Sequence, residues 1–241
     1  MNASKLIIVF IITSILTGCG EFLDVKLDKN FPLNIKNSGQ SIIIASTAPI
    51  NTEPKILVKY ISDKCTRTHF NSDFMPTGKD KRTRKRDLNF QRINNNKFEV
   101  KVPLNGGGWC DWKLSDMTIG LIYTQHPLAK KDTKFYKSGI LSVSINDMNK
   151  SRDSSEKNIE NKIDYTPTFY TEYEEYIGKY SEIVFLSPEV DSDYRLWLRS
   201  GNDGYINYSP KLDTSKITKV FQDKENKWTE YPNGEIKYEK K

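Results

Sequence analysis

Short apolar runs alternate with polar turns along most of this chain. The alternation is clearest in residues 97–104, where Phe98, Val100, Val102 and Leu104 fall on one face at a period of two. Asn233-Gly234 is a strong two-residue hairpin signal. Further strands are predicted at residues 41–46, 55–61, 109–114, 118–123, 140–145, 182–186, 194–199, 205–208, 219–221, 227–231 and 235–238. The pattern predicts a mainly β protein, with an immunoglobulin-like β-sandwich domain over residues 41–146.

A polar stretch divides this pattern. Residues 147–163 are nearly free of strand formers and are predicted to be a linker. Thr166-Pro167 then has the form of a helix N-cap followed by proline. After it, apolar side chains recur at helical spacing, at Phe169, Tyr173, Tyr176, Ile177 and Tyr180. We therefore expect residues 164–241 to form a β-rich C-terminal region that carries one short helix.

The amino-terminal residues have the layout of a secretory signal. Lys5 precedes an apolar run over residues 6–16, which is too short to span a bilayer as a helix. The following Leu16-Thr17-Gly18-Cys19 resembles the lipobox of bacterial lipoproteins. That resemblance implies a signal peptide over residues 1–18, an acylated Cys19 and a tether over residues 19–40. Gly20, in place of an aspartate, implies sorting to the outer membrane, and we expect the body to face the periplasm.

Two cysteines remain once Cys19 carries lipid. The implied compartment is oxidising, so Cys65 and Cys110 are expected to form a disulfide. In the chain-entropy model a loop of this length contributes roughly 4 kcal/mol. Alternatives stay open: a cysteine nucleophile, or zinc held by both cysteines with His69 and His126. Neither spacing matches a known motif, so the sequence predicts no catalytic residue, no metal and no cofactor.

Positive charge is concentrated in residues 79–86, read as a loop between the two cysteines. Its cations are Lys81, Arg82, Arg84, Lys85 and Arg86. Such a run could bind anionic lipid headgroups, an acidic protein surface or nucleic acid, or it could be a solvated loop tip. Nucleic acid is not expected in the envelope.

An acidic, tyrosine-rich stretch over residues 170–176 carries the opposite charge. Tyr170 and Tyr173 in this stretch are candidate contacts to a partner, because tyrosine is favoured at interfaces. The structural alternative is that the aromatic stripe belongs to the core.

The lipobox and the segment Trp109-Cys110-Asp111-Trp112-Lys113-Leu114 together resemble periplasmic immunity lipoproteins of type VI secretion systems. The resemblance implies a protein that binds and blocks a toxic effector and needs no active site. The alternatives are an envelope assembly lipoprotein, which would bind a membrane complex or peptidoglycan, and a carboxylate-dependent hydrolase.

Overall fold

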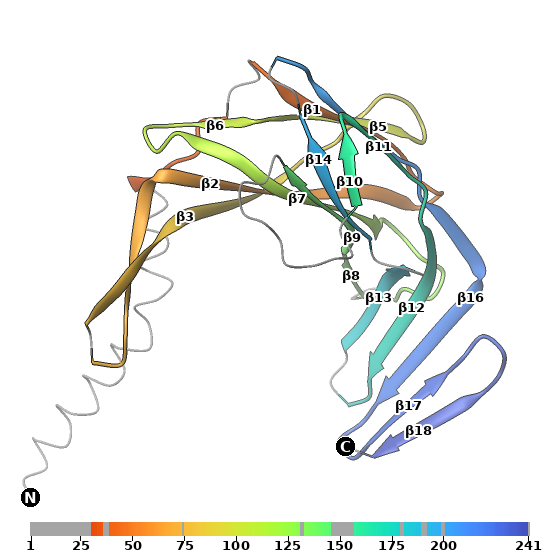
Figure 1. The fold of residues 1–241 in the computed structure, drawn as a ribbon. Coiled ribbons are helices and arrows are strands. Elements are labelled where there is room, and N and C mark those ends of the chain that lie inside the picture. The colour runs from red at the N-terminus through yellow and green to blue at the C-terminus, as the bar shows by residue number, and fades with distance from the viewer. Residues whose placement is uncertain are drawn as a thin grey trace, which may run out of the picture.

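The computed structural model describes residues 30–35, 39–73, 75–130, 133–145, 157–178, 181–188, 192–198 and 201–240. Their regular structure is almost entirely β-strand, arranged in three sheets (Figure 1). The prediction of a mainly β fold is confirmed. Cys19 and the predicted signal peptide lie outside the described residues, as does Tyr180. No helix among the described residues is long and apolar enough to cross a membrane.

Two of the sheets form a sandwich. The first, sheet A, has the order β11 (Lys162–Tyr165), β15 (Gly204–Tyr208), β1 (Ser41–Thr47), β5 (Lys97–Pro103) and β4 (Gln91–Arg92). The second, sheet B, has the order β10 (Lys157–Glu160), β14 (Ser192–Trp197), β9 (Ser138–Ile145), β7 (Trp112–Tyr123), β2 (Thr52–Phe70) and β3 (Pro76–Leu88), with β6 (Asn105–Gly107) paired to β7.

The core lies between these sheets and follows from period-two alternation. In β1, Ile42 and Ile44 are fully buried, and in β2 the buried positions include Val58 and Tyr60. The Tyr60 hydroxyl donates a hydrogen bond of 2.9 Å across the sandwich to the Pro103 carbonyl. Burial raises the pKa of Tyr60 to about 12, with a smaller opposing effect from the Arg86 charge. The phenol therefore stays neutral and acts as a hydrogen-bonded core residue.

The immunoglobulin-like detail of the prediction is not confirmed. Immunoglobulin sheets are antiparallel, whereas six pairs among the described strands are parallel, including β1 with β15 and β9 with β14. Strands from both sides of the predicted linker therefore complete the same two sheets. Within that linker, residues 147–156 are outside the described part, but residues 157–163 include β10 and the start of β11. The linker prediction is wrong for residues 157–163. Ile159 and Ile163 belong to β10 and β11, and the polar residues around them hid the strand pattern in the sequence.

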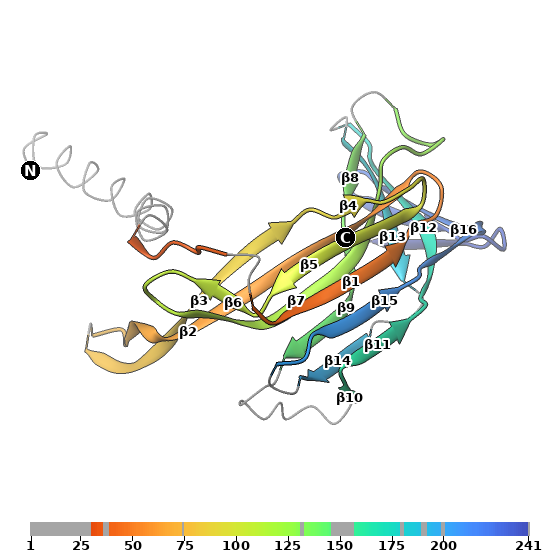
Figure 2. The ribbon, with the colours of Figure 1, turned by 90° about the horizontal axis from the view of Figure 1, so that it is seen from above.

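The third sheet, sheet C, extends from one end of the sandwich (Figures 1 and 2). Its order is β18 (Ile236–Lys240), β17 (Asn226–Glu230), β16 (Lys211–Gln222), β12 (Thr168–Tyr176), β13 (Ser181–Pro188) and β8 (Lys134–Tyr136). Parallel neighbours β11 and β15 in sheet A continue into parallel neighbours β12 and β16 in sheet C. Hydrogen bonds from Ser209 N to Tyr165 O (2.9 Å) and from Lys211 N to Pro167 O (2.8 Å) bridge the junction.

The predicted helix after Thr166-Pro167 is wrong, because residues 168–176 form strand β12. Phe169, Thr171 and Tyr173 are buried in strict alternation, whereas the predicted helical stripe did not include Thr171. Its oxygen lies 2.7 Å from the Tyr123 hydroxyl of β7. Aromatic and β-branched residues favour such a strand.

Candidate functional site

A long hairpin projects from the sandwich at the end opposite to sheet C (Figures 1 and 2). It is made by β2 and β3, and we call its residues 63–86 the arm. The antiparallel register shifts between Ser62 and Thr66. Before this shift every second residue of β2 is buried, whereas beyond it Cys65 is the one fully buried residue among those whose side chains the structure describes. On β2 the arm therefore begins where the ribbon leaves the core, whereas on β3 residues 82–86 still pair with residues 58–62 of the core part of β2.

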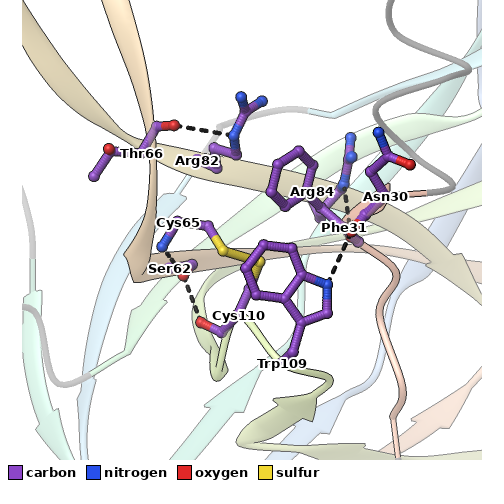
Figure 3. Close-up of a disulfide and its surroundings, with 9 residues drawn as sticks. All are labelled: Asn30, Phe31, Ser62, Cys65, Thr66, Arg82, Arg84, Trp109 and Cys110. Carbon is purple, nitrogen blue, oxygen red and sulfur yellow. Dashed lines mark hydrogen bonds between the residues drawn. A yellow bond between two sulfur atoms is a disulfide. The ribbon is translucent and has the colours of Figure 1, made fainter.

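A disulfide between Cys65 and Cys110 fastens the arm at this shift, with the two Cα atoms 5.4 Å apart (Figure 3). Both cysteines are buried. The Ser62 hydroxyl accepts a hydrogen bond from Cys65 N (2.9 Å) and donates one to the Cys110 carbonyl. The predicted pairing is confirmed, and because it uses both thiols, neither is available as a nucleophile or a zinc ligand.

Three glycines precede Cys110, and two of them have positive φ, at 63° for Gly107 and 71° for Gly108. A Cβ on Gly107 would lie 2.2 Å from the Asn34 carbonyl oxygen, and one on Gly108 would lie 2.6 Å from that of Pro32. Asn34 N also donates a hydrogen bond of 2.9 Å to Gly106 O. The glycines thus form the seat for residues 30–35, which we call the strap.

Side chains from the arm and from Trp109 hold the strap (Figure 3). The Phe31 ring lies 5.0 Å from that of Trp109, whose indole N–H donates a hydrogen bond of 2.9 Å to the Asn30 carbonyl. From the other side, the Arg82 guanidinium lies 4.3 Å from the Phe31 ring centroid, a cation–π contact. Arg84 Nε donates to the Phe31 carbonyl at 3.4 Å. This part of the predicted tether is therefore bound to the body.

The residues predicted as a basic loop form strand β3 instead, and alternation sorts them onto two faces. Arg82 and Arg84 are half-buried against the strap, and Arg86 shares their face but is exposed, as are Lys81 and Lys85 on the other face. Lys81 makes an ion pair of 2.6 Å with Asp63, and that hydrogen bond holds the pKa of the carboxyl below its usual value. The strand was missed because residues 79–86 contain no apolar side chain, and their pairing depends on β2.

The two histidines lie in separate places. His69 pairs with Asp80 within the arm. His126 lies near the junction with sheet C, where its ring is 4.8 Å from Tyr123 and its Nδ1 accepts a hydrogen bond of 3.2 Å from Leu128 N. Burial lowers the pKa of His126. No cluster of metal-ligating side chains occurs within the described ranges.

The two tyrosines predicted as partner contacts lie on opposite faces of β12. Tyr173 is buried, and its ring packs edge-on against Phe221 at 6.2 Å. Its hydroxyl donates a hydrogen bond of 2.9 Å to Glu175. Tyr170 is half-buried on the other face. Since Tyr173 belongs to the core, it does not present a surface to a partner in this structure.

Sequence reasoning missed an exposed aromatic surface on the same face of sheet C as Tyr173. The Phe221 and Trp228 rings stack at 5.3 Å, and Tyr238 lies directly opposite Trp228 on the edge strand β18. Tyr238 is 73% exposed, and Ile236 beside it is 48% exposed. We call Phe221, Trp228, Ile236 and Tyr238 the aromatic row. The predicted hairpins contained its signal, since directly opposed residues share a face.

No protein-family model matches the chain, and no match was found among curated proteins or among solved structures.

Proposed function

We propose that the chain is a lipid-anchored binding protein of the bacterial envelope that blocks a toxic effector delivered into the periplasm. In this proposal Cys19 carries the lipid in the outer membrane and the body faces the periplasm. The Leu16–Cys19 motif supports the anchor, and the buried disulfide is compatible with an oxidising compartment. The proposal assigns the chain no catalytic residue and no cofactor.

The observation that carries a binding role is the aromatic row. Its exposure increases from half-buried Phe221 and Trp228 to Tyr238, which leaves most of its ring in water on an edge strand. Exposed Tyr and Trp are favoured as interface anchors because they bury large areas with few rotatable bonds. The row is also at the end of the molecule away from the strap, where a tethered protein is most accessible to a partner.

The charged rim of the row adds specificity to this surface. Lys219 pairs with Glu230 at 3.8 Å on the same face as the row, so these flanking charges are balanced within the sheet. Lys227 and Glu239, which pair at 3.8 Å, alternate with Trp228 and Tyr238 and lie on the opposite face. A polar rim around an apolar centre is the usual anatomy of a non-obligate interface. The partner surface we propose is therefore apolar at its centre, with hydrogen-bonding groups around it.

The test combines genetics with a matched pair of variants. Deletion of the gene is expected to sensitise cells to an effector encoded next to it. Ile236→Ser with Tyr238→Ala is expected to lose that protection and binding to the purified effector, with unchanged thermal unfolding. Ile50→Ser is the control, because Ile50 is an exposed apolar side chain, at 85%, that belongs to the turn after β1 and not to sheet C.

Protection that survives the double variant would contradict this surface. A deletion without phenotype and without an adjacent toxin gene would contradict the function itself. Recovery of a stable complex with envelope proteins or peptidoglycan, and of no effector, would favour the envelope assembly alternative.

A further inference from the structure

The excess positive charge of this chain is located almost entirely in the arm. Residues 63–86 contain eight lysines and arginines and three aspartates, a formal charge of +5 out of +6 for the whole chain. The remaining +1 equals the single cation of the predicted signal peptide, Lys5, so the rest of the chain is formally neutral. Because the charge is separated in this way, the arm is the main source of the positive electrostatic potential around the molecule.

Most of these cations have no structural task. Arg82 and Arg84 hold the strap, and Lys81 pairs with Asp63. The other five, Lys64, Arg67, Lys79, Lys85 and Arg86, are exposed and form no ion pair with a described residue. Charges on an edge strand such as β3 also prevent edge-to-edge aggregation. That role needs only a few charges, whereas β3 carries six lysines and arginines between Lys79 and Arg86.

The strap is the first described segment after Cys19 in the chain, and it lies at the root of the arm. Asn30 and Phe31 are held at the root of the arm by Trp109, Arg82 and Arg84. Cys19 precedes Asn30 by eleven residues, which extend over at most about 40 Å. The 13 residues of β3 span a similar distance, roughly 40 Å. An anchor at Cys19 and the arm can therefore reach the same bilayer surface.

We propose that the arm binds anionic phospholipid headgroups and so holds the anchored molecule in a fixed orientation, with sheet C directed away from the membrane. Exposed Met75, at 62%, is at the end of the ribbon and enters the headgroup region. Clustered cations close to a lipid anchor provide the second binding signal that acyl chains alone do not supply. The orientation rests on the proposed anchor, whereas lipid binding by the arm does not.

The experiment uses the native chain purified from membranes. It is mixed with vesicles of phosphatidylcholine, alone or with phosphatidylglycerol, and followed by flotation and by tryptic cleavage. On anionic vesicles we expect cleavage between Lys79 and Arg86 to slow by about fivefold or more, while cleavage at exposed Lys224 in the turn before β17 is unchanged. Salt at about 0.5 M should restore cleavage, because the Debye length falls to roughly 4 Å.

A matched pair of variants isolates the arm. Lys79→Gln with Lys85→Gln should weaken protection by on the order of 10-fold. Lys101→Gln with Lys211→Gln removes the same charge from exposed positions outside the arm, keeps the reference cleavage site at Lys224 and should leave protection unchanged. Equal weakening by both pairs would overturn the proposal, because it would indicate attraction by net charge alone.

The outcomes separate the arm from the anchor. If the protein floats with neutral vesicles and its arm is cleaved equally on both vesicle types, the result supports the anchor and overturns the proposal. Flotation on anionic vesicles alone, with the arm protected, supports the proposal and contradicts the acylated anchor. If no vesicle protects the arm from cleavage but the purified effector does, the arm binds a protein partner instead, and the proposal is overturned.

Discussion

The arm and sheet C leave the same sandwich at opposite ends, and they are attached by different means. Sheet C continues two strands of sheet A without a break in hydrogen bonding and buries Thr171 against Tyr123. The arm has no apolar face among its described side chains and depends on one disulfide and the strap. A two-stranded ribbon alone is marginal in water. The comparison indicates that sheet C is stabilised by the core, whereas the arm is stabilised by two local fastenings.

Removal of the disulfide is expected to have the largest effect. Cys65→Ala with Cys110→Ala opens a loop closed over a sequence separation of 45, which corresponds to roughly 4 kcal/mol in the chain-entropy model. Urea unfolding measures the loss. Hydrogen exchange should show faster opening of β2 and β3 beyond Ser62, with β12 and β16 unchanged at low denaturant. Equal loosening of both ends would contradict the separate attachment of the arm.

The seat of the strap is expected to be the next most sensitive position. Gly107→Ala places a Cβ at positive φ against the Asn34 carbonyl and should cost about 3 kcal/mol. Fluorescence of Trp109, which packs on Phe31, reports release of the strap. Gly78→Ala is the control, since a Cβ there meets nothing within 4 Å. A neutral Gly107→Ala would show that the strap does not occupy this seat.

Removal of either of two buried tyrosine hydroxyls is expected to change the free energy of unfolding, with opposite signs for Tyr123 and Tyr208. Tyr123→Phe removes the bond to Thr171 and leaves that buried hydroxyl unpaired, which should cost about 1 to 2 kcal/mol. Tyr208 is fully buried, and its hydroxyl bonds to no described residue. Tyr208→Phe should therefore stabilise the chain by about 1 kcal/mol. Thermal unfolding of both variants checks the signs, and destabilisation by Tyr208→Phe would reveal a partner for that hydroxyl.

A smaller effect is expected from pH at the junction with sheet C. Burial lowers the pKa of His126 below 6.5, so the unfolded chain takes up this proton more readily. The contribution of neutral His126 to the free energy of unfolding is fully present above pH 6.5 and is lost as the pH falls through the folded-state pKa. His126→Gln should flatten the pH dependence of unfolding in that range. An unchanged slope would mean that another group dominates.

Local patterns predicted the strands whose faces differ in polarity. The alternation from Phe98 to Val102 predicted β5, and the expectation of an oxidising compartment predicted the pairing of Cys65 with Cys110. The helix at residues 166–180 was wrong because Phe169, Thr171 and Tyr173 are buried at the period of two of a strand, whereas the helical stripe omitted Thr171. The error has a physical origin, since a hydroxyl can be buried when a distant partner such as Tyr123 satisfies it.

Features of the site that depend on distant segments could not be predicted. The basic strand β3 carries no alternation of its own and pairs only because β2 lies beside it. Gly107 and Gly108, before Cys110, make their closest contacts with carbonyls more than 70 residues earlier in the chain, which no local pattern indicates. The aromatic row crosses three strands, so its members become neighbours only through the register of sheet C.

Site-specific photocrosslinking in cells exposed to the neighbouring effector tests the account most directly. A photoreactive phenylalanine would replace Tyr238 in the aromatic row or Thr77 in the arm, both exposed positions. The account predicts a discrete adduct with the effector from position 238, and lipid but no protein adduct from position 77. An effector adduct from position 77, with none from position 238, would contradict it.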